Sequence, residues 1–294
     1  MRVGVAGLGL MGSGIAARLL AKGHDLSVYN RSKEKAEQFS KARVAASPKE
    51  LASTCNLVIT VVTDFAAVHE VLLGQDGVIQ SDSSSLIVAD ASTISPSQSS
   101  ECAQALRNTG IEMLGMPVMG GPAAAESGDL VPMVAGSRQA FEKALPVIEK
   151  LGTPFYIGSR DGAANAMKLA LNLNIALIAS AVSEGITLVR GSGIDPSIFI
   201  HILNSTYFKT GLSEKKGPKM VSGDFTPQAR LSQHIKDVRL MIAEASRGGN
   251  TLPLTATHLQ LLELAEATGL GDHDNSAIIK AIETHAFRSA LNNR

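Results

Sequence analysis

A glycine-rich turn near the start of the chain is the first feature whose residue types could do chemistry. Glycines at positions 7, 9 and 12 follow an apolar, strand-like run at 3–6 and precede a helix-like run at 13–21. In that setting the first glycine permits a tight turn, the second lets the backbone approach a pyrophosphate, and the third lets helix pack on strand. A turn with a purely structural role is the alternative. The residues predicted to contact a dinucleotide are Gly7, Leu8, Gly9, Leu10, Met11 and Gly12.

The segment after the next strand-like run, 26–29, indicates which dinucleotide the chain binds. An NAD site usually places an acidic residue there to hold the ribose 2′-hydroxyl. This chain instead has Asn30, Arg31 and Ser32, followed by Lys35. Because no carboxylate repels a 2′-phosphate and a guanidinium could pair with it, the sequence favours NADP over NAD. The alternative is that Arg31 is only a solvated loop charge.

A solitary lysine is the second feature that could do chemistry. Lys168 is the only ionisable residue between Gly162 and Ser183. Loss of hydration in apolar surroundings lowers the pKa of a lysine toward the range that is useful for acid–base catalysis. Asn172 follows four residues later on the same helical face and could share its hydrogen bonds. We therefore predict Lys168 and Asn172 as catalytic residues; the alternative is a lysine that snorkels from a helix end without a function.

The apolar stretch that carries this lysine has two interpretations. As one helix, residues 162–190 would be roughly 45 Å long, which is enough to span a membrane. Asn165, Asn172, Asn174 and Ser180 weaken that interpretation. A helix that is apolar all round is also typical of a large core or a subunit interface. The sequence therefore favours a helix that links two domains, and no membrane partner is expected.

The flanking segments predict how these groups are positioned. From residue 2 to 156, short β-branched runs alternate with amphipathic stretches, as in a parallel sheet covered by helices, and after Gly158 only helical patterns remain. The helical segments are predicted to be bounded by Pro196, Pro218, Pro227 and Pro253. The predicted fold class is α/β, an N-terminal Rossmann-type doubly wound sheet plus a C-terminal all-α domain, linked by a long helix. The predicted divisions are 1–160, 161–191 and 192–294, with the active site in the cleft between the two domains.

Composition and charge exclude several classes of function. Lys plus Arg and Asp plus Glu both count 27 in 294 residues, so there is no basic field to neutralise nucleic-acid phosphates. Cys55 and Cys102 form neither a CxxC pair nor a metal cluster, and we expect reduced thiols in a cytoplasmic protein. The cluster at 272–274, Asp-His-Asp, is more typical of a helix cap than of a metal site. We expect no metal and no nucleic-acid partner.

Five motifs in one order resemble the β-hydroxyacid dehydrogenase family, which includes 3-hydroxyisobutyrate dehydrogenases and semialdehyde reductases. The resemblance spans essentially the whole chain. The motifs are the glycine turn at 7–12, Asp90 to Pro96, Gly120-Gly121 with Glu126 to Gly128, Gly162 to Lys168 with Asn172, and Lys236-Asp237. The resemblance implies that Lys168 protonates a carbonyl oxygen as hydride arrives from the nicotinamide, and takes the proton back in the oxidation direction. It also implies a homodimer or homotetramer whose subunits meet through the long helix and the helical domain.

The resemblance implies roles for further residues. Ser92 helps to hold the substrate, Thr93 lies against the cofactor, and Asn172 orients the substrate oxygen. Lys236 lies by the nicotinamide and the acidic end of the substrate. An alternative role for Ser92 and Thr93 is to cap a helix that begins near residues 95–96. The predicted cofactor contacts also include Val62 and Thr63, at the end of the apolar run that starts at residue 57.

One segment departs from the family pattern. Where relatives commonly read Asp-Ala-Pro-Val-Ser-Gly-Gly, this chain has Gly115-Met-Pro-Val-Met119-Gly120-Gly121. The serine of the relatives helps to bind the substrate carboxylate, whereas Met119 offers only a soft, apolar thioether. Backbone N–H groups of Gly120 and Gly121 could still bind an anion. Met119, Gly120 and Gly121 are therefore predicted substrate contacts, with weaker carboxylate recognition and room for a larger or less polar carbonyl compound.

The sequence thus predicts an NADPH-dependent reductase, or NADP-dependent dehydrogenase, that interconverts a small aldehyde or keto acid of the semialdehyde type and its β-hydroxyacid. An imine reductase of the same fold is one rival; it usually replaces the lysine, but Met119 is compatible with it. A decarboxylating phosphosugar-acid dehydrogenase would need a basic cluster for the substrate phosphate, which this sequence lacks. A non-catalytic NADP-binding sensor is the rival from another class, and it would need no ordered set of Lys168, Asn172 and Lys236.

Overall fold

The computed structural model describes residues 1–83 and 85–284 and divides into two compact units, Met1–Lys168 and Leu169–Arg294. The last ten residues of the predicted helical domain, 285–294, lie outside the described residues. Each unit has its own hydrophobic core.

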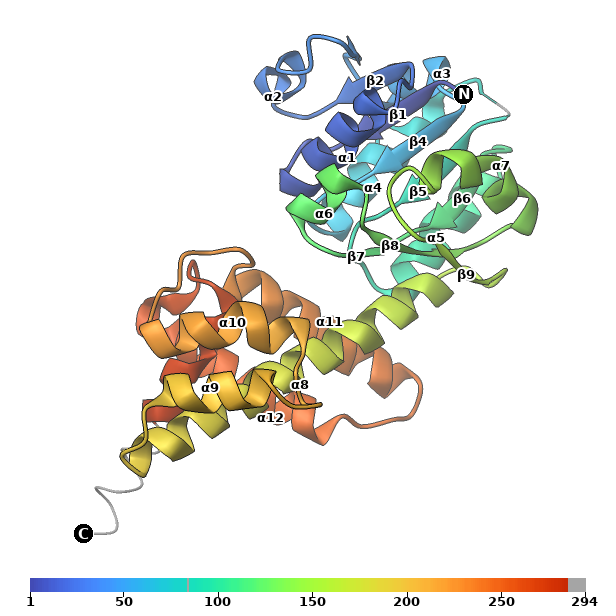
Figure 1. The fold of residues 1–294 in the computed structure, drawn as a ribbon. Helices are drawn as coiled ribbons and strands as arrows, with labels where there is room; N and C mark the ends of the chain where they lie inside the picture. Colours follow the sequence, from blue (N-terminus) through green and yellow to red (C-terminus); the bar gives the residue numbers. More distant parts are fainter. Residues whose placement is uncertain (84, 285–294) are drawn as a thin grey trace. The chain divides into compact units, whose positions relative to one another are not determined.

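A nine-stranded sheet forms the centre of the first unit (Figure 1), in the order β3-β2-β1-β4-β5-β6-β8-β7, with β9 beside β8. The strands are β1 (Val3–Ala6), β2 (Leu26–Tyr29), β3 (Arg43–Val44), β4 (Leu57–Thr60), β5 (Ile87–Asp90), β6 (Glu112–Gly115), β7 (Val118–Met119), β8 (Val131–Ala135) and β9 (Phe155–Gly158). The strands from β3 to β6 along this order are parallel, and β8 is antiparallel to β6 and β7. The order reverses direction at β1, as in doubly wound dinucleotide-binding sheets.

Helices cover both faces of this sheet, because β1, β4 and β5 are buried along their whole length. The helices of the unit are α1 (Leu10–Ala21), α2 (Lys33–Glu37), α3 (Pro48–Thr54), α4 (Phe65–Leu73), α5 (Pro96–Arg107), α6 (Pro122–Ser127) and α7 (Arg138–Ile148), with a 3₁₀ turn at Val78–Gln80. Side chains of α1, α6 and α7 form the core on one face. Those of α3, α4 and α5 form the core on the other.

The first strand–turn–helix segment shows how close the sequence prediction comes. The bounds of β1 and β2 agree with the predicted runs, but α1 begins at Leu10 instead of Ser13. Gly9 is extended and caps the helix, and the Ser13 N–H already donates to the Gly9 carbonyl at 2.9 Å. The helix therefore starts inside the glycine motif rather than after it.

The predicted long helix is α8 (Ala163–Gly191), which contains the boundary between the two units. It is long and apolar enough to cross a membrane, and one third of its most apolar window is buried within the chain. Length and composition are weak evidence for a span, because core helices of soluble proteins pass the same test. With the sheet of the first unit and the helices of the second, α8 confirms the predicted fold class.

The elements of the second unit are helices joined by loops (Figure 1), with one isolated β-bridge between Arg230 and Asp274. After α8 it contains α9 (Pro196–Asn204), α10 (Gly211–Ser222), α11 (Leu231–Arg247), α12 (Pro253–Ala265), and short helical turns at Glu266–Leu270 and Asn275–Ala277. Its core includes Val182, Ile186, Ile235 and Leu262. The core therefore joins α8, α11 and α12 within the unit.

The prolines of the second unit test the predicted helix boundaries. Pro196 and Pro253 occupy the first turns of α9 and α12, where a missing N–H has no cost. The boundary predicted at Pro218 is wrong, because this residue lies inside α10. Proline has no N–H to donate to the preceding turn. Packing offsets that loss, since the neighbouring Gly217 lies against Ile200.

Candidate active site

The glycine turn at 7–12 has the geometry that its three glycines require. Gly7 has a φ of +96°, and a Cβ there would lie 2.2 Å from the Val61 carbonyl oxygen. A Cβ on Gly12 would lie 1.8 Å from the Gly7 carbonyl oxygen. By contrast, a Cβ on Gly9 would meet nothing within 4 Å. The first and third glycines therefore serve the turn itself, and the second leaves a clear approach to the backbone.

The amino end of α1 is open to an anion. Its cap residue, Gly9, has no side chain to accept hydrogen bonds from the first turn, and the adjacent Leu10 side chain is 76% exposed. Uncapped first-turn N–H groups and the positive end of the helix dipole together bind phosphate groups. The residues present therefore fit the pyrophosphate of a dinucleotide.

Asn30 supports the turn rather than facing outward. Its Oδ1 accepts a hydrogen bond from the Leu8 N–H at 2.9 Å, and its Nδ2 donates to the Ser32 carbonyl at 2.9 Å. Arg31 and Lys35 are exposed. Within the described part of the chain Arg31 forms no ion pair. Its guanidinium is consequently available to a ligand phosphate, although cofactor contact by residues 30–35 stays a prediction.

A buried hydrogen-bond network joins the carboxyl ends of β4 and β5. The Thr60 hydroxyl donates to Asp90 Oδ1 at 2.6 Å, and the Ser92 N–H donates to the same oxygen at 3.3 Å. The Ser92 hydroxyl in turn accepts from the Val62 N–H at 3.0 Å. Burial raises the pKa of Asp90 to about 6, against the hydrogen bonds from Thr60 and Ser92, which lower it. The network fixes the two loops that carry the predicted contacts at 62–63 and 92–93.

Sequence reasoning gave Asp90 no role of its own. The signal was present, since a polar residue ends each of two adjacent buried strands, at Thr60 and Asp90. The alternative of helix capping by Ser92 and Thr93 is wrong. The cap of α5 is Ser95, whose hydroxyl accepts from the Gln98 N–H at 3.2 Å while Gln98 returns a hydrogen bond to the Ser95 N–H.

Lys168 lies in the second turn of α8 and is half-buried. Its ammonium donates to the Val118 carbonyl oxygen at 2.8 Å and to the Met119 sulfur at 3.1 Å. Met119 is also half-buried and packs against a small apolar cluster that includes Met133 and Ala164. The structure therefore brings together two predicted site residues, Lys168 and Met119, whose contact the sequence did not indicate.

Gly120 and Gly121 follow Met119 directly in the chain. Gly120 has a φ of +120°, and a Cβ there would lie 2.8 Å from the Leu130 side chain, so the position requires glycine. Gly121 caps α6 and has open space where a Cβ would stand. The predicted contact of these two residues with a substrate anion stays a prediction.

Two predicted site residues belong to the second unit. Asn172 lies one turn beyond Lys168 on α8 and is half-buried. Lys236 lies on α11 with one third of its side chain exposed, and its Nζ is 3.5 Å from Asp237 Oδ1. Their catalytic and cofactor roles, and the cleft predicted for the active site, stay predictions.

The acidic cluster at 272–274 serves structure. The Asp274 carboxylate accepts from the Ser276 N–H at 3.1 Å and caps the turn at 275–277, which confirms the predicted cap. Its two oxygens also accept from the Lys216 ammonium, each at 2.7 Å. Among residues 1–83 and 85–284, no group of three His, Cys, Asp or Glu side chains could hold a metal ion.

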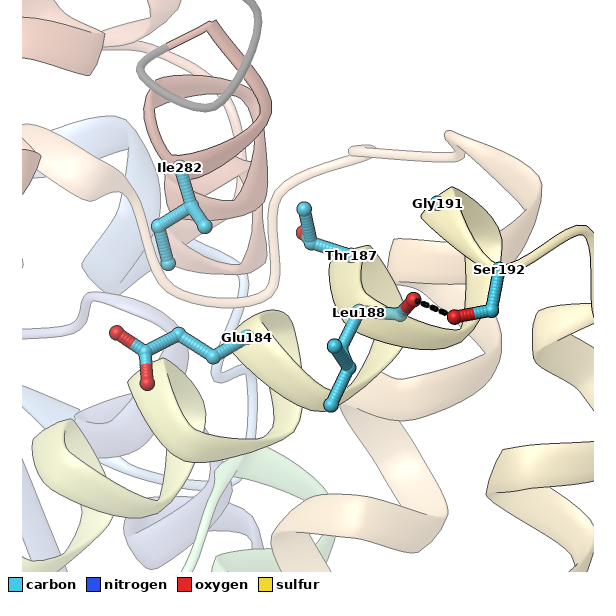
Figure 2. Close-up of a pocket in the computed structure, with 6 residues that line it drawn as sticks. All are labelled: Glu184, Thr187, Leu188, Gly191, Ser192 and Ile282. Atoms are coloured by element: carbon cyan, nitrogen blue, oxygen red, sulfur yellow. Dashed lines mark hydrogen bonds between the residues drawn. The ribbon is translucent and has the colours of Figure 1, made fainter. Parts of the chain in front are cut away.

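A pocket of about 490 Å³ lies on the second unit, and no predicted site residue lines it (Figure 2). Its walls are Glu184, Thr187, Leu188, Gly191 and Ser192 of α8, together with Ile282. Leu188 is 72% exposed. The pocket is therefore an apolar surface feature of the helical unit and not part of the candidate site.

Two family models match consecutive parts of the chain. The NAD binding domain of 6-phosphogluconate dehydrogenase matches residues 2–158, and the NAD-binding model of NADP-dependent 3-hydroxyisobutyrate dehydrogenase matches residues 162–282. Glyoxylate/succinic semialdehyde reductase 2, chloroplastic, from Arabidopsis thaliana is 31% identical over 98% of this chain and 81% of its own length. The human cytokine-like nuclear factor N-PAC is 32% identical over 95% of this chain, which spans 51% of that relative.

Solved structures show the same fold. A 3-hydroxyisobutyrate dehydrogenase from Salmonella typhimurium superimposes with a TM-score of 0.86 at 29% identity, covering 95% of this chain and 99% of that one. A reductive aminase from Aspergillus terreus, solved with NADPH and ethyl levulinate, has a TM-score of 0.63 at 23% identity, covering 96% of this chain and 99% of that one. The second likeness concerns the fold alone.

Proposed function

Because the chain belongs to the 3-hydroxyisobutyrate dehydrogenase family of NAD(P)-binding oxidoreductases that act on CH–OH groups, we propose that it reduces a small semialdehyde-type aldehyde or keto acid with NADPH, and oxidises the β-hydroxyacid with NADP in reverse. The observation that carries this proposal is the Lys168 ammonium, held by the Val118 carbonyl and the Met119 sulfur. An amine fixed in that way is a proton donor for a carbonyl oxygen.

Each group of the candidate site has one task in this reaction. The bound nicotinamide supplies the hydride, or accepts it in the reverse direction. The open backbone at Gly9 and the uncapped first turn of α1 bind the pyrophosphate, and Arg31 pairs with the 2′-phosphate. Lys168 Nζ gives its proton to the substrate carbonyl oxygen and takes it back on oxidation, while Asn172 orients that oxygen. Met119, which packs against an apolar cluster, presents its sulfur to the ammonium.

Replacement of Lys168 by alanine tests the proton donor. We expect Lys168→Ala to bind NADPH as the wild type does and to lower kcat by about two orders of magnitude or more, because general acid catalysis contributes that much. Fluorescence titration measures binding, and NADPH absorbance measures turnover. Lys143→Ala, the same change at an exposed position of α7, is the control. Turnover near that of the control would remove Lys168 from the mechanism.

Arg31 tests the cofactor preference. Arg31→Asp removes a charge-assisted contact and adds a repulsive one, so kcat/KM for NADPH should fall about 10- to 100-fold while the value for NADH holds or rises. Steady-state kinetics with both cofactors measure the ratio. Lys33→Asp, two residues further on at another exposed position, is the matched control. An unchanged preference in Arg31→Asp would contradict NADP selection by this residue.

The Met119 contact favours a second candidate, reduction of a cyclic imine. A sulfur faces the ammonium where relatives commonly carry a hydroxyl, so the site offers less to a substrate carboxylate. Following NADPH absorbance with semialdehydes, keto acids and cyclic imines separates the two reactions. The name of the N-PAC relative is not that of an oxidoreductase. Tight NADPH binding without turnover of any compound would accordingly favour the non-catalytic sensor.

We also propose that the chain forms a homodimer or homotetramer. Ile194, Ile198 and Ile202 are spaced by four residues and are between 48% and 57% exposed on and beside α9. Such a stripe of large apolar side chains is typical of an interface. Light scattering after size exclusion should give a multiple of the 30.7 kDa chain, and Ile198→Glu should reduce it to one. A wild-type monomer would contradict the proposal; the cytoplasmic location stays a prediction.

A further inference from the structure

Among the buried side-chain oxygens of the first unit that lack a hydrogen-bond partner within the described residues, two belong to segments that carry predicted site residues. They are Asp90 Oδ2 and Asn165 Oδ1, and their residues are 0% and 1% exposed. The other groups of the same side chains are engaged, since Asp90 Oδ1 accepts from Thr60 and Ser92, and Asn165 Nδ2 donates to the Ile94 carbonyl at 3.5 Å. A buried acceptor without a donor is costly, so each of these oxygens needs one.

Asn165 Oδ1 lies over the residue of β6 that is in register with Asp90. Asp90 on β5 is in register with Gly115 on β6, and residues in register point to the same face of a sheet. A Cβ on Gly115 would lie 2.9 Å from Asn165 Oδ1 and 3.2 Å from the Ser99 hydroxyl. Adjacent strands lie about 4.8 Å apart. Asn165 Oδ1 therefore lies over Gly115, the neighbour of Asp90 across the two strands, at a position where only glycine leaves room.

The chemistry of the two atoms indicates what joins them. A carboxylate oxygen and an amide oxygen are both acceptors, so they cannot bond to each other. A water molecule has two O–H donors, and buried waters typically satisfy polar groups of this kind. The chain has glycine at position 115, so no side chain fills the place beside Asn165 Oδ1.

We propose that Asp90 is a positioning residue and that one buried water molecule links its Oδ2 to Asn165 Oδ1. Through Oδ1, Asp90 holds Thr60 and Ser92 and thereby the Val62 N–H. Through the water it holds Asn165, in the first turn of α8, three residues before Lys168. The link connects the loops at 62–63 and 92–93 with the first turn of α8, directly before the turn that carries Lys168.

A double-mutant cycle tests the link, and its kinetic arm rests on the proposed function. Asn165→Leu removes the acceptor on α8 but leaves the bonds of Asp90 to Thr60 and Ser92. We expect kcat to fall about 5- to 10-fold, since small displacements of a catalytic group are costly, with the Kd for NADPH within about twofold of wild type. Asp90→Leu should lower kcat at least about tenfold and also weaken NADPH binding, because the loops lose their tie.

The combination of the two changes decides between a link and two separate effects. Because both residues share one water, Asp90→Leu/Asn165→Leu should have a kcat within about twofold of Asp90→Leu. Asp90→Asn keeps the Oδ1 acceptor and offers an N–H to the water, so it should rescue most of the activity. Multiplicative losses in the double variant, or an Asp90→Asn variant as impaired as Asp90→Leu, would overturn the proposal. Asn108→Leu, at the exposed cap of α5, is the control for the Asn-to-Leu change and should equal wild type.

A high-resolution crystal structure tests the water without any activity. In the wild type we expect one water within hydrogen-bond distance of Asp90 Oδ2 and Asn165 Oδ1. In Asp90→Asn it should lie between the new amide nitrogen and Asn165 Oδ1, and it should be absent from Asn165→Leu. An empty space in the wild type would overturn the proposal even if every variant were inactive. Conversely, failure of all substrates and of NADPH binding would remove the proposed function but leave this result standing. Should Asp90→Leu fail to fold, Asp90→Asn, Asn165→Leu and the crystal structures still decide.

Discussion

Asp90 in the first unit and Asp274 in the second are both fully buried. Their pKa values are nevertheless shifted in opposite directions from that of a free aspartate. Burial raises the pKa of Asp90 to about 6. Burial acts on Asp274 in the same sense, but hydrogen bonds from Lys216, the Gln228 N–H and Ser276 outweigh it and lower its pKa to about 2. The two residues differ in their donors and not in their burial.

The donors show what each carboxyl does. Both oxygens of Asp274 are saturated by an ammonium, backbone N–H groups and a hydroxyl, so this carboxylate is a fixed structural centre of the helical unit. Asp90 receives two donors on one oxygen and has none, among the described residues, on the other. An incompletely satisfied carboxyl with a raised pKa, at the carboxyl edge of a parallel sheet, is typical of a functional region.

Removal of the Asp274 charge should have the largest effect on stability. Asp274→Asn leaves the Lys216 ammonium in a largely buried site without its carboxylate, because the Lys216 side chain is only 13% exposed. The free energy of unfolding should fall by about 3–5 kcal/mol. Urea denaturation followed by circular dichroism measures it. Asp224→Asn, at an exposed aspartate of the same unit, is the control.

The double replacement sharpens this result. Asp274→Leu/Lys216→Leu removes both charges, so part of the lost stability should return relative to Asp274→Leu alone. A double variant that is less stable than either single variant would show that the ion pair is not the cause. If Asp274→Asn lost no more free energy of unfolding than the Asp224→Asn control, the ion pair of Asp274 with Lys216 would not be important for stability.

The pH dependence of stability should separate the two aspartates. The pKa of Asp90 is about 6 in the fold against 3.8 for a free side chain, so the folded state binds more protons between these values. Stability should therefore decrease as pH rises from about 4 to 6, by roughly 3 kcal/mol from this group. Asp274 acts in the opposite sense, because its lowered pKa stabilises the fold above about pH 4 and that contribution is lost toward pH 2.

Asp90→Asn isolates the first contribution. In this variant the thermal unfolding temperature should fall less steeply between pH 4 and pH 6 than in the wild type. Asp274→Asn should instead lower the unfolding temperature at every pH in this range and leave its pH dependence unchanged. Calorimetry in steps of pH measures both. Equal slopes in wild type and Asp90→Asn would show that Asp90 does not titrate in this range.

The smallest expected effect is on a histidine near Lys216. The pKa of His234 is lowered to about 4, first by burial and then by the charge of Lys216, and its Nε2 lies 3.1 Å from that of His258. In Lys216→Met the pKa of His234 should rise but stay below 6.5, because burial persists. Nuclear magnetic resonance titration of the imidazoles measures it, with His24 in the first unit as the control. An unchanged pKa of His234 would show that the charge of Lys216 does not contribute to lowering it.

Local sequence pattern was enough to locate the elements. The apolar runs at 3–6 and 26–29 became β1 and β2, the glycine spacing gave the turn between β1 and α1, and the apolar stretch after 162 became α8. These features depend on neighbouring residues, through strand and helix periodicity and the φ angles that glycine allows. The start of α1 and the position of Pro218 were not predictable in this way, because capping geometry and packing decide them.

Candidate site residues were predictable by type but not by partner. The sequence singled out Lys168 and Met119 separately, and only the fold places the ammonium 3.1 Å from the sulfur, 49 positions apart in the chain. Asn30 was predicted as a cofactor contact, which stays a prediction, and only the fold shows that its Oδ1 accepts a hydrogen bond from the Leu8 N–H. Contacts between distant segments depend on strand order and helix packing, which periodicity does not encode.

By itself the sequence determined a dinucleotide-binding turn, a lysine in an apolar helix and the α/β fold class, because each follows from local geometry and hydrophobic pattern. Only the tertiary structure decided which buried aspartate is saturated and which is not. Asp90 and Asp274 are the same residue type with the same burial. Their pKa values differ because the fold brings the Lys216 ammonium, 58 positions away in the chain, to Asp274, whereas burial dominates at Asp90, which has no partner on Oδ2 among the described residues.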